Sequence, residues 1–409
     1  MSVEKNPVVS VLAAVFLCLT GCEGSSTASD AELVQRATDQ IASRVRDSNP
    51  DLLPGAQEDI SDAASDALTQ LSGGAFDVRG ITALRELVEK GDFVAAQALL
   101  SEQAVRPDLA AGERARAFEG VGALSVLHDR SAAAAAYTRA LALDATSIDA
   151  LRQLGQIQMV ENDLDQAQAT YQRLLEVATA EQDRANVAHA HANLGLIAVM
   201  AEPEGAEAGR RQLAQALAID TELGRKAAMA DHHSRLAYLN DSEGDPDAAI
   251  AEVLQAIELN QELDRKVGVA IAQLYLGKLY GDGVMFREGY HDKAVTALEA
   301  AVAAGEAAGA RLTTAHAYDA LGQLHYSAEE YPRAEAALQT AIELTQALGL
   351  DYPAAVQRVN LAGIYEILEK RDLARAALRE SLATFEKLDS VAEAEQVKQT
   401  LERLDAEER

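Results

Sequence analysis

The chain has 409 residues, with 4% aromatic residues, no tryptophan, and 65 acidic against 36 basic residues, for a net charge of −29. This acidity argues strongly against nucleic acid as a ligand, because a polyanion would be repelled. The alanine-rich composition is that of helical proteins, and the length is sufficient for several domains or one long solenoid. The acidity fits either a soluble helical surface or a basic partner.

Residues 1–21 predict a signal peptide. After a weakly positive start at Lys5, the apolar run Val8 to Leu19 has the length of a signal-peptide core and is shorter than the ~20 residues of a spanning helix. It ends in Leu19-Thr20-Gly21-Cys22, which resembles the lipobox of bacterial lipoproteins. That resemblance implies cleavage before Cys22 and lipidation of its thiol. Ordinary cleavage near Gly21, with Cys22 unmodified, is the alternative.

The predicted anchor has two consequences. Cys18 and Cys22 are the two cysteines of the chain, so cleavage between them leaves one and excludes an internal disulfide in the mature protein. Several acyl chains, as in bacterial lipoproteins, would hold the protein durably at a membrane. By resemblance, Glu23 in place of an aspartate after the cysteine favours the outer membrane, with the protein facing the periplasm.

Residues 22–76 are expected to form a tether followed by N-terminal helices. Residues from Glu23 to Ser29 are small and polar, as in flexible linkers. Helical spacing of apolar residues then predicts helices over Asp30–Val45 and Ile60–Leu71, with Gly73-Gly74 ending the second. Neither helix fits the repeats downstream. They either cap the first repeat or lie loosely between membrane and repeats.

A helix-turn-helix pattern begins clearly at Asp149. Gly155 in the predicted first helix allows a second helix to approach closely, and Asn162-Asp163 supplies a left-handed turn residue and an N-cap. Ala167 and Tyr171 follow on the inner face of the predicted second helix. This order of residues resembles a tetratricopeptide repeat. The resemblance implies an all-α protein, a right-handed α-solenoid of stacked helix-turn-helix repeats.

The pattern recurs over residues 77–389, which predicts seven to eight repeats. Its small first-helix residues are Gly155, Gly195, Ala237, Gly277, Gly322 and Ala362, and its second-helix ends are Leu223-Gly224, Leu263-Asp264, Ala308-Gly309, Leu348-Gly349 and Leu388-Asp389. The spacing of 40 to 45 residues exceeds the usual 34 and resembles the longer-repeat branch of the family. Residues 390–409 are expected to form a C-terminal capping helix over the last apolar face.

The segment Gly281 to Tyr290 lengthens one inter-helix turn and carries Met285 and Phe286. These two side chains are expected to tuck against a neighbouring helix, and an exposed contact site is the alternative.

Motifs for catalysis are missing from the sequence. It contains no HExxH, no Gly-x-Ser-x-Gly, no phosphate loop and no cysteine–histidine zinc spacing. The pairs His189/His191 and His232/His233 point to different helix faces and are expected to be ordinary helix-surface histidines. We therefore predict a protein that is not an enzyme and has no cofactor and no metal.

The tetratricopeptide resemblance implies binding of proteins or peptides along a concave groove lined by the first helices. Asn193 and Asn360 occupy matching places and are expected to bond a ligand backbone. The Lys/Arg/Asn clamp of chaperone-tail-binding members is not supported, because repeated lysines are missing. For each residue, simple solvation is the alternative. The expected groove residues are Arg152, Gln156, His189, Asn193, Arg235, Tyr238, Lys278, His316, Asp319, Gln323, Tyr326 and Asn360.

The function predicted on this basis is a lipid-anchored scaffold or adaptor that binds envelope proteins. A peptide-responsive regulatory or sensory module is the alternative, and an enzyme is disfavoured. The sequence leaves the partner, its pathway and the oligomeric state open.

Overall fold

The structure is a computed structural model that describes residues 87, 93–126, 129–201, 205–283 and 287–406. These residues form helices and turns and no strand. Predictions on residues 1–76, Cys22 included, and on Met285 and Phe286 lie outside the described part. Within it, every helix is too short or too polar to cross a bilayer.

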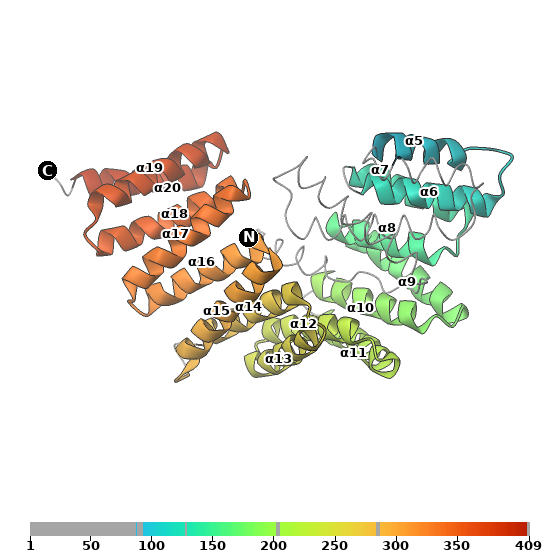
Figure 1. Cartoon of the computed structure of the whole chain (residues 1–409), viewed down its shortest axis with the longest axis horizontal. Helices are drawn as coiled ribbons and strands as arrows, with labels where there is room; N and C mark the ends of the chain where they lie inside the picture. The colour runs from blue at the N-terminus through green and yellow to red at the C-terminus, as the bar shows by residue number, and fades with distance from the viewer. Residues whose placement is uncertain (1–86, 88–92, 127–128, 202–204, 284–286, 407–409) are drawn as a thin grey trace. The chain divides into compact units, whose positions relative to one another are not determined.

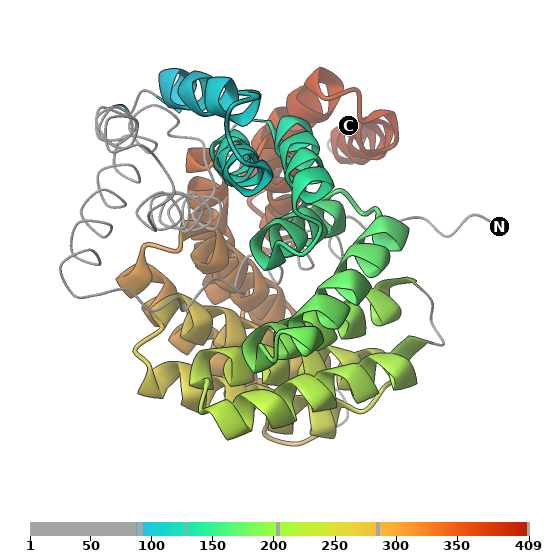
Figure 2. The same cartoon turned by 90° about the vertical axis from the view of Figure 1, so that its right-hand side faces the viewer.

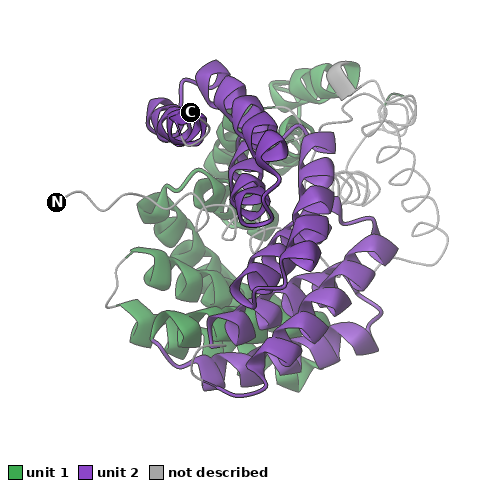
Figure 3. Ribbon diagram, turned by 90° about the vertical axis from the view of Figure 1, so that its left-hand side faces the viewer, with its two compact units in different colours: residues 1–243 green, residues 244–409 purple. Residues whose placement is uncertain are grey.

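The chain divides into two compact units, residues 1–243 and 244–409 (Figure 3). The described helices of unit 1 are α5 (Phe93–Ala104), α6 (Ala111–Ser125), α7 (Arg130–Leu143), α8 (Ile148–Val160), α9 (Leu164–Ala180), α10 (Arg184–Ala201), α11 (Ala206–Leu223) and α12 (Lys226–Ser242). Those of unit 2 are α13 (Pro246–Glu262), α14 (Lys266–Asp282), α15 (Tyr290–Ala308), α16 (Arg311–Ser327), α17 (Tyr331–Ala347), α18 (Asp351–Ile367), α19 (Arg371–Lys387) and α20 (Val391–Ala406).

Within each unit, successive helices form antiparallel hairpins that stack on one another (Figure 1). In unit 1, α8 packs on α9 and α10 packs on α11, and the second helix of one hairpin contacts the first helix of the next (Figure 2). In unit 2 the pairs are α14 with α15, α16 with α17 and α18 with α19. The predicted all-α solenoid of stacked helix-turn-helix repeats is confirmed.

The small first-helix residues allow the second helix of each hairpin to pack closely against the first. A Cβ atom added at Gly155 would lie 2.8 Å from the Tyr171 ring, which is 1% exposed. One added at Gly322 would lie 2.6 Å from Cγ of Leu338, also 1% exposed. In both hairpins the large side chain of the second helix fills the space that the missing Cβ leaves.

The turns carry the expected caps. The Asp163 carboxylate accepts a hydrogen bond from the backbone N–H of Gln166 at 3.3 Å, and Asn162 has a φ of 60°. Second helices end in left-handed residues that close the last turn. Those predicted from the sequence are Gly224, Asp264, Gly309, Gly349 and Asp389, with φ of 67°, 52°, 69°, 69° and 55°.

The C-terminal helix α20 packs on α19 at the end of unit 2. Val397 and Leu404 are each 3% exposed and belong to the apolar cluster shared with α19. From α19, Arg375 donates to the Asp405 carboxylate at 3.1 Å and to the Leu404 carbonyl at 3.1 Å. A capping helix of this kind removes the apolar face that a stacked array would otherwise expose.

Replacing Glu329 by glycine should raise the free energy of unfolding by about 0.5–1 kcal/mol, because a left-handed conformation is strained for any residue with a Cβ. Glu329 sits in the turn after α16 with a φ of 60°. Urea unfolding measures the effect. Gly349→Ala, at a φ of 69°, is the opposite control and should destabilise. A lower midpoint for Glu329→Gly would contradict the turn geometry.

Candidate functional site

Side chains from three first helices of unit 1 converge beside Tyr171 of α9. We define the basic cluster as Arg152 of α8, His189 of α10 and Arg235 of α12. The His189 ring lies 6.0 Å from the Tyr171 ring, centroid to centroid. Asn193 donates to the His189 carbonyl at 3.0 Å and lies 3.1 Å from Nε2 of that ring. The sequence predicted these four polar residues for the first-helix face, and the structure brings them together.

Arg235 is the most unusual member of the basic cluster. The residue is 3% exposed, and both terminal nitrogens, Nη1 and Nη2, are buried without a hydrogen-bond partner among the described residues. Burial lowers the pKa of its guanidinium, and the negative charge of Asp231 opposes that shift. A buried cation without an acceptor is costly, and such groups are normally paired. Among the described residues, Arg235 therefore lacks the acceptor that a buried guanidinium normally has.

His189 contributes a neutral ring to the basic cluster. Burial lowers its pKa well below the usual value, and the charges of Arg152 and Arg235 act in the same direction. The ring is thus uncharged at neutral pH, so the positive charge of the cluster resides on its two arginines. Burial also raises the pKa of Tyr171, which keeps its phenol protonated.

A second network lies nearby and is paired within the chain, except at Nδ1 of His232, which is buried without a hydrogen-bond partner among the described residues. Nε2 of His232 lies 2.7 Å from one Asp220 carboxylate oxygen, and Arg225 donates to the other at 3.0 Å. Arg225 also donates to the Ala185 carbonyl at 3.1 Å. His232 is 3% exposed, so the expectation of a helix-surface histidine was wrong for this residue. The reason is that α12 buries this face against α11, which adjacency in sequence does not reveal.

The first-helix face of unit 2 carries a mixed polar set. Lys278 of α14 and His316 and Asp319 of α16 are partly buried. Asp319 accepts a hydrogen bond from Gln323 at 2.8 Å, whereas its Oδ1 is buried without a partner among the described residues. Burial raises the pKa of Asp319, and the charge of Lys278 opposes the shift. Burial and Lys278 together lower the pKa of His316 to about 4.

The remaining predicted residues differ in exposure. Gln156 and Tyr238 are half-buried, and Gln323, Tyr326 and Asn360 are exposed. Asn193 is 2% exposed and engaged by His189, so it does not share the environment of Asn360 despite their matching places in the repeat. Peptide contacts by these residues stay predictions.

His316 should make unit 2 less stable in acid. Its folded pKa of about 4 lies below the ~6.5 of an unfolded histidine, so stability is lost as pH falls from 6.5 towards 4. The loss is at most about 3 kcal/mol, and the raised pKa of Asp319 offsets part of it. Chemical denaturation at several pH values should show a flatter profile for His316→Asn. Equal slopes for both proteins would refute this.

Comparison with known proteins agrees with the fold. The tetratricopeptide repeat model matches residues 233–263. No curated protein sequence matches the chain. Aspartyl phosphate phosphatase F from Bacillus subtilis is 13% identical with a TM-score of 0.53, over 93% of this chain and 97% of that one.

Two further solved structures resemble the chain. The quorum sensor NprR from B. thuringiensis, in its apo form, is 14% identical with a TM-score of 0.53, over 93% of this chain and 99% of that one. A signal transduction ATPase with a tetratricopeptide repeat sensor from Pyrococcus horikoshii is 13% identical. Its TM-score is 0.51, and the match covers 97% of this chain and 69% of that one. These identities establish the fold alone. The repeat match and the fold together support a tetratricopeptide repeat protein, a class whose arrays bind proteins or peptides.

Proposed function

We propose that the chain is a lipid-anchored adaptor of the bacterial envelope whose first-helix face binds a carboxylate on a partner protein or peptide. The observation that carries the proposal is Arg235, whose two terminal nitrogens are buried without a partner among the described residues, in the same cluster as Arg152 and His189. A carboxylate matches the planar donor fork of arginine and forms two parallel hydrogen bonds with it. Away from water this pairing is stronger than at the surface.

The net negative charge of the chain limits which anionic ligands can reach the basic cluster. The basic cluster lies in a chain of net charge −29, so extended polyanions are repelled before they reach it. A peptide with a single carboxylate avoids most of that repulsion. This arrangement differs from a lysine clamp, since it uses two arginines and a neutral histidine. Because both Arg235 nitrogens are covered, binding also requires neighbouring side chains to move aside.

Paired peptide libraries test the carboxylate. Random octapeptides with a free C-terminus and the same octapeptides with a C-terminal amide are bound to the full chain and to Arg235→Met. If the partner is bound through its C-terminus, we expect peptides with a free C-terminus to be enriched and amidated peptides not to be. This enrichment should be lost with Arg235→Met. Enrichment of amidated peptides containing Asp or Glu would instead identify a side-chain carboxylate. Equal binding by Arg235→Met in every arm would refute the proposal.

The anchor rests on the lipobox at Leu19 to Cys22. Cys22→Ser should move the protein from the membrane fraction to the soluble periplasm, because the acyl chains would be lost. Cys18→Ser is the matched control and should leave the protein at the membrane. Cell fractionation reads both outcomes. A Cys22→Ser protein that still sediments with membranes would show that the anchor is not this lipid.

A peptide-responsive regulatory module is the second candidate. One ground for it is the likeness of the fold to a quorum sensor. The other is that the side chains that bury the terminal nitrogens of Arg235 must move before a ligand can bind. Membrane pull-down separates the two functions. An adaptor retains a stable protein partner, whereas a regulator releases a small peptide.

A further inference from the structure

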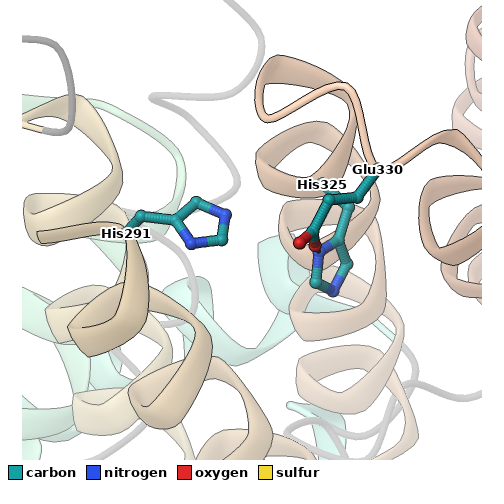
Figure 4. Close-up of side chains that lie close together, drawn as sticks. All are labelled: His291, His325 and Glu330. Atoms are coloured by element: carbon teal, nitrogen blue, oxygen red, sulfur yellow. Dashed lines mark hydrogen bonds and ion pairs between the residues drawn. The ribbon is translucent and has the colours of Figure 1, made fainter. Parts of the chain in front are cut away.

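Three side chains of unit 2 come together at the end of a hairpin (Figure 4). His291 lies in the first turn of α15, His325 in the last turn of α16, and Glu330 in the turn before α17. One nitrogen or oxygen atom of each lies within 4.8 Å of the other two. In Figure 4 the His291 ring projects across the gap towards the other two side chains.

Two members of this trio already form a pair. Nδ1 of His325 lies 2.7 Å from Oε2 of Glu330. Hydrogen bonding from His325, followed by the charge of Arg333, holds the pKa of the Glu330 carboxyl below its usual value. The pair therefore supplies one nitrogen and one oxygen donor from neighbouring side chains.

The third member, His291, has one ring nitrogen that takes no part in the hydrogen bonding of the described residues. Nε2 of His291 is buried and has no hydrogen-bond partner among the described residues. Its Nδ1 lies 3.6 Å from the Asp292 carboxylate, which is too long for a hydrogen bond. The centroids of the His291 and His325 rings lie 6.3 Å apart, and the ring planes are inclined by 62° in an edge-on arrangement. A ring nitrogen buried without a partner beside a histidine–carboxylate pair indicates an additional group between them.

We propose that His291, His325 and Glu330 bind one zinc ion, with water in the fourth position. Two imidazoles and a carboxylate form a known zinc ligand set, and imidazole disfavours Mg²⁺ and Ca²⁺. Ligand bonds of about 2.0–2.2 Å require the three atoms to draw together from their present separations. The His291 side chain is 27% exposed, which leaves it room to make this movement.

Zinc binding breaks the hydrogen bond between His325 and Glu330 and meets one competitor. A neutral imidazole that ligates through one nitrogen carries its proton on the other, so the step needs no net proton release. Nη1 of Arg333 lies 3.2 Å from Oε2 of Glu330, so this guanidinium competes for the same oxygen. The bound ion would join the start of α15 to the turn between α16 and α17, and so tie two successive hairpins together.

Titration of the chelator-treated full chain with Zn²⁺ at pH 7.5 tests the site. We expect one saturable ion per chain and a higher melting temperature on binding. Co²⁺ in place of Zn²⁺ should give the visible absorption of a four-coordinate site. His291→Ala and Glu330→Gln should each weaken zinc binding at least tenfold. His291→Ala should leave the metal-free melting temperature nearly unchanged, because Nε2 makes no hydrogen bond.

His191→Ala is the control for other histidines, since Nδ1 of His191 lies 2.6 Å from Gln212 in unit 1. This variant should bind zinc as the unaltered chain does. Binding that His291→Ala and Glu330→Gln leave unchanged would mean an adventitious ion only, and would overturn the proposal. The absence of saturable binding at micromolar zinc would overturn it as well. Neither result depends on the anchor or on carboxylate recognition by Arg235.

Discussion

Arg235→Met should stabilise the free protein and abolish its preference for carboxylate-bearing peptides. The substitution removes a buried cation without an acceptor and keeps an unbranched apolar side chain of similar length. Replacing buried ion pairs by well-packed apolar residues of similar volume is often neutral or stabilising by about 1–4 kcal/mol, and for this buried cation we expect a gain within that range. Urea unfolding measures stability, and the paired octapeptide libraries measure binding. Opposite changes in stability and binding are the signature of a binding residue.

Arg211→Met is the matched control for this prediction. Arg211 is exposed on α11 and pairs with Glu207, one turn earlier on the same helix. Its replacement should change stability by no more than about 0.5 kcal/mol and leave peptide binding intact. If Arg235→Met instead destabilises the free protein, the guanidinium holds the fold together and its assignment as an anion receptor is wrong.

Gly322→Ala should destabilise unit 2 by about 1–3 kcal/mol, whereas Gly363→Ala should stabilise it by about 0.5–1 kcal/mol. Both glycines lie in first helices, one in α16 and one in α18. A Cβ atom at Gly322 would lie 2.6 Å from Cγ of Leu338, which is buried. A Cβ atom at Gly363 would meet no atom within 4 Å. Helix propensity alone therefore sets the change in stability for Gly363→Ala, whereas packing against Leu338 sets it for Gly322→Ala.

Chemical denaturation of the two variants gives this comparison directly. Their effects on the free energy of unfolding should have opposite signs. If both variants are stabilised, Leu338 has room to move away, and the close approach of the two helices does not depend on glycine. Leu338→Ala should cost about 2–5 kcal/mol, which provides a scale for the packing at this point.

Local signals made the repeat predictable from the sequence. Gly155 and Tyr171 belong to one hairpin, and Asn162-Asp163 lies in its turn, so the rules for close approach and capping apply to neighbours in the chain. The left-handed residues that end second helices, such as Gly309, are predictable for the same reason, since a helix C-cap also depends on neighbouring residues in the chain. Each of these features depends on backbone geometry over a few residues.

The chemistry of the site was less predictable, because it depends on which helix face is buried. Arg235 and His232 lie on the same helix, and both were expected to be accessible or at the surface. Each is 3% exposed, yet His232 is paired and the terminal nitrogens of Arg235 are not. His291 and His325 are far apart in sequence and meet through the packing of α15 on α16. A spacing rule for metal ligands misses such a pair.

Site-specific photocrosslinking in cells tests most directly whether the first-helix face is the binding surface. A benzophenone amino acid replaces Gln156, half-buried on first helix α8, or Gln172, exposed on second helix α9 of the same hairpin. We expect a partner to be crosslinked through Gln156, with less product in the Arg235→Met variant, and little or no product through Gln172. Crosslinking through Gln172 alone, or equally through both positions regardless of Arg235, would contradict binding at this face.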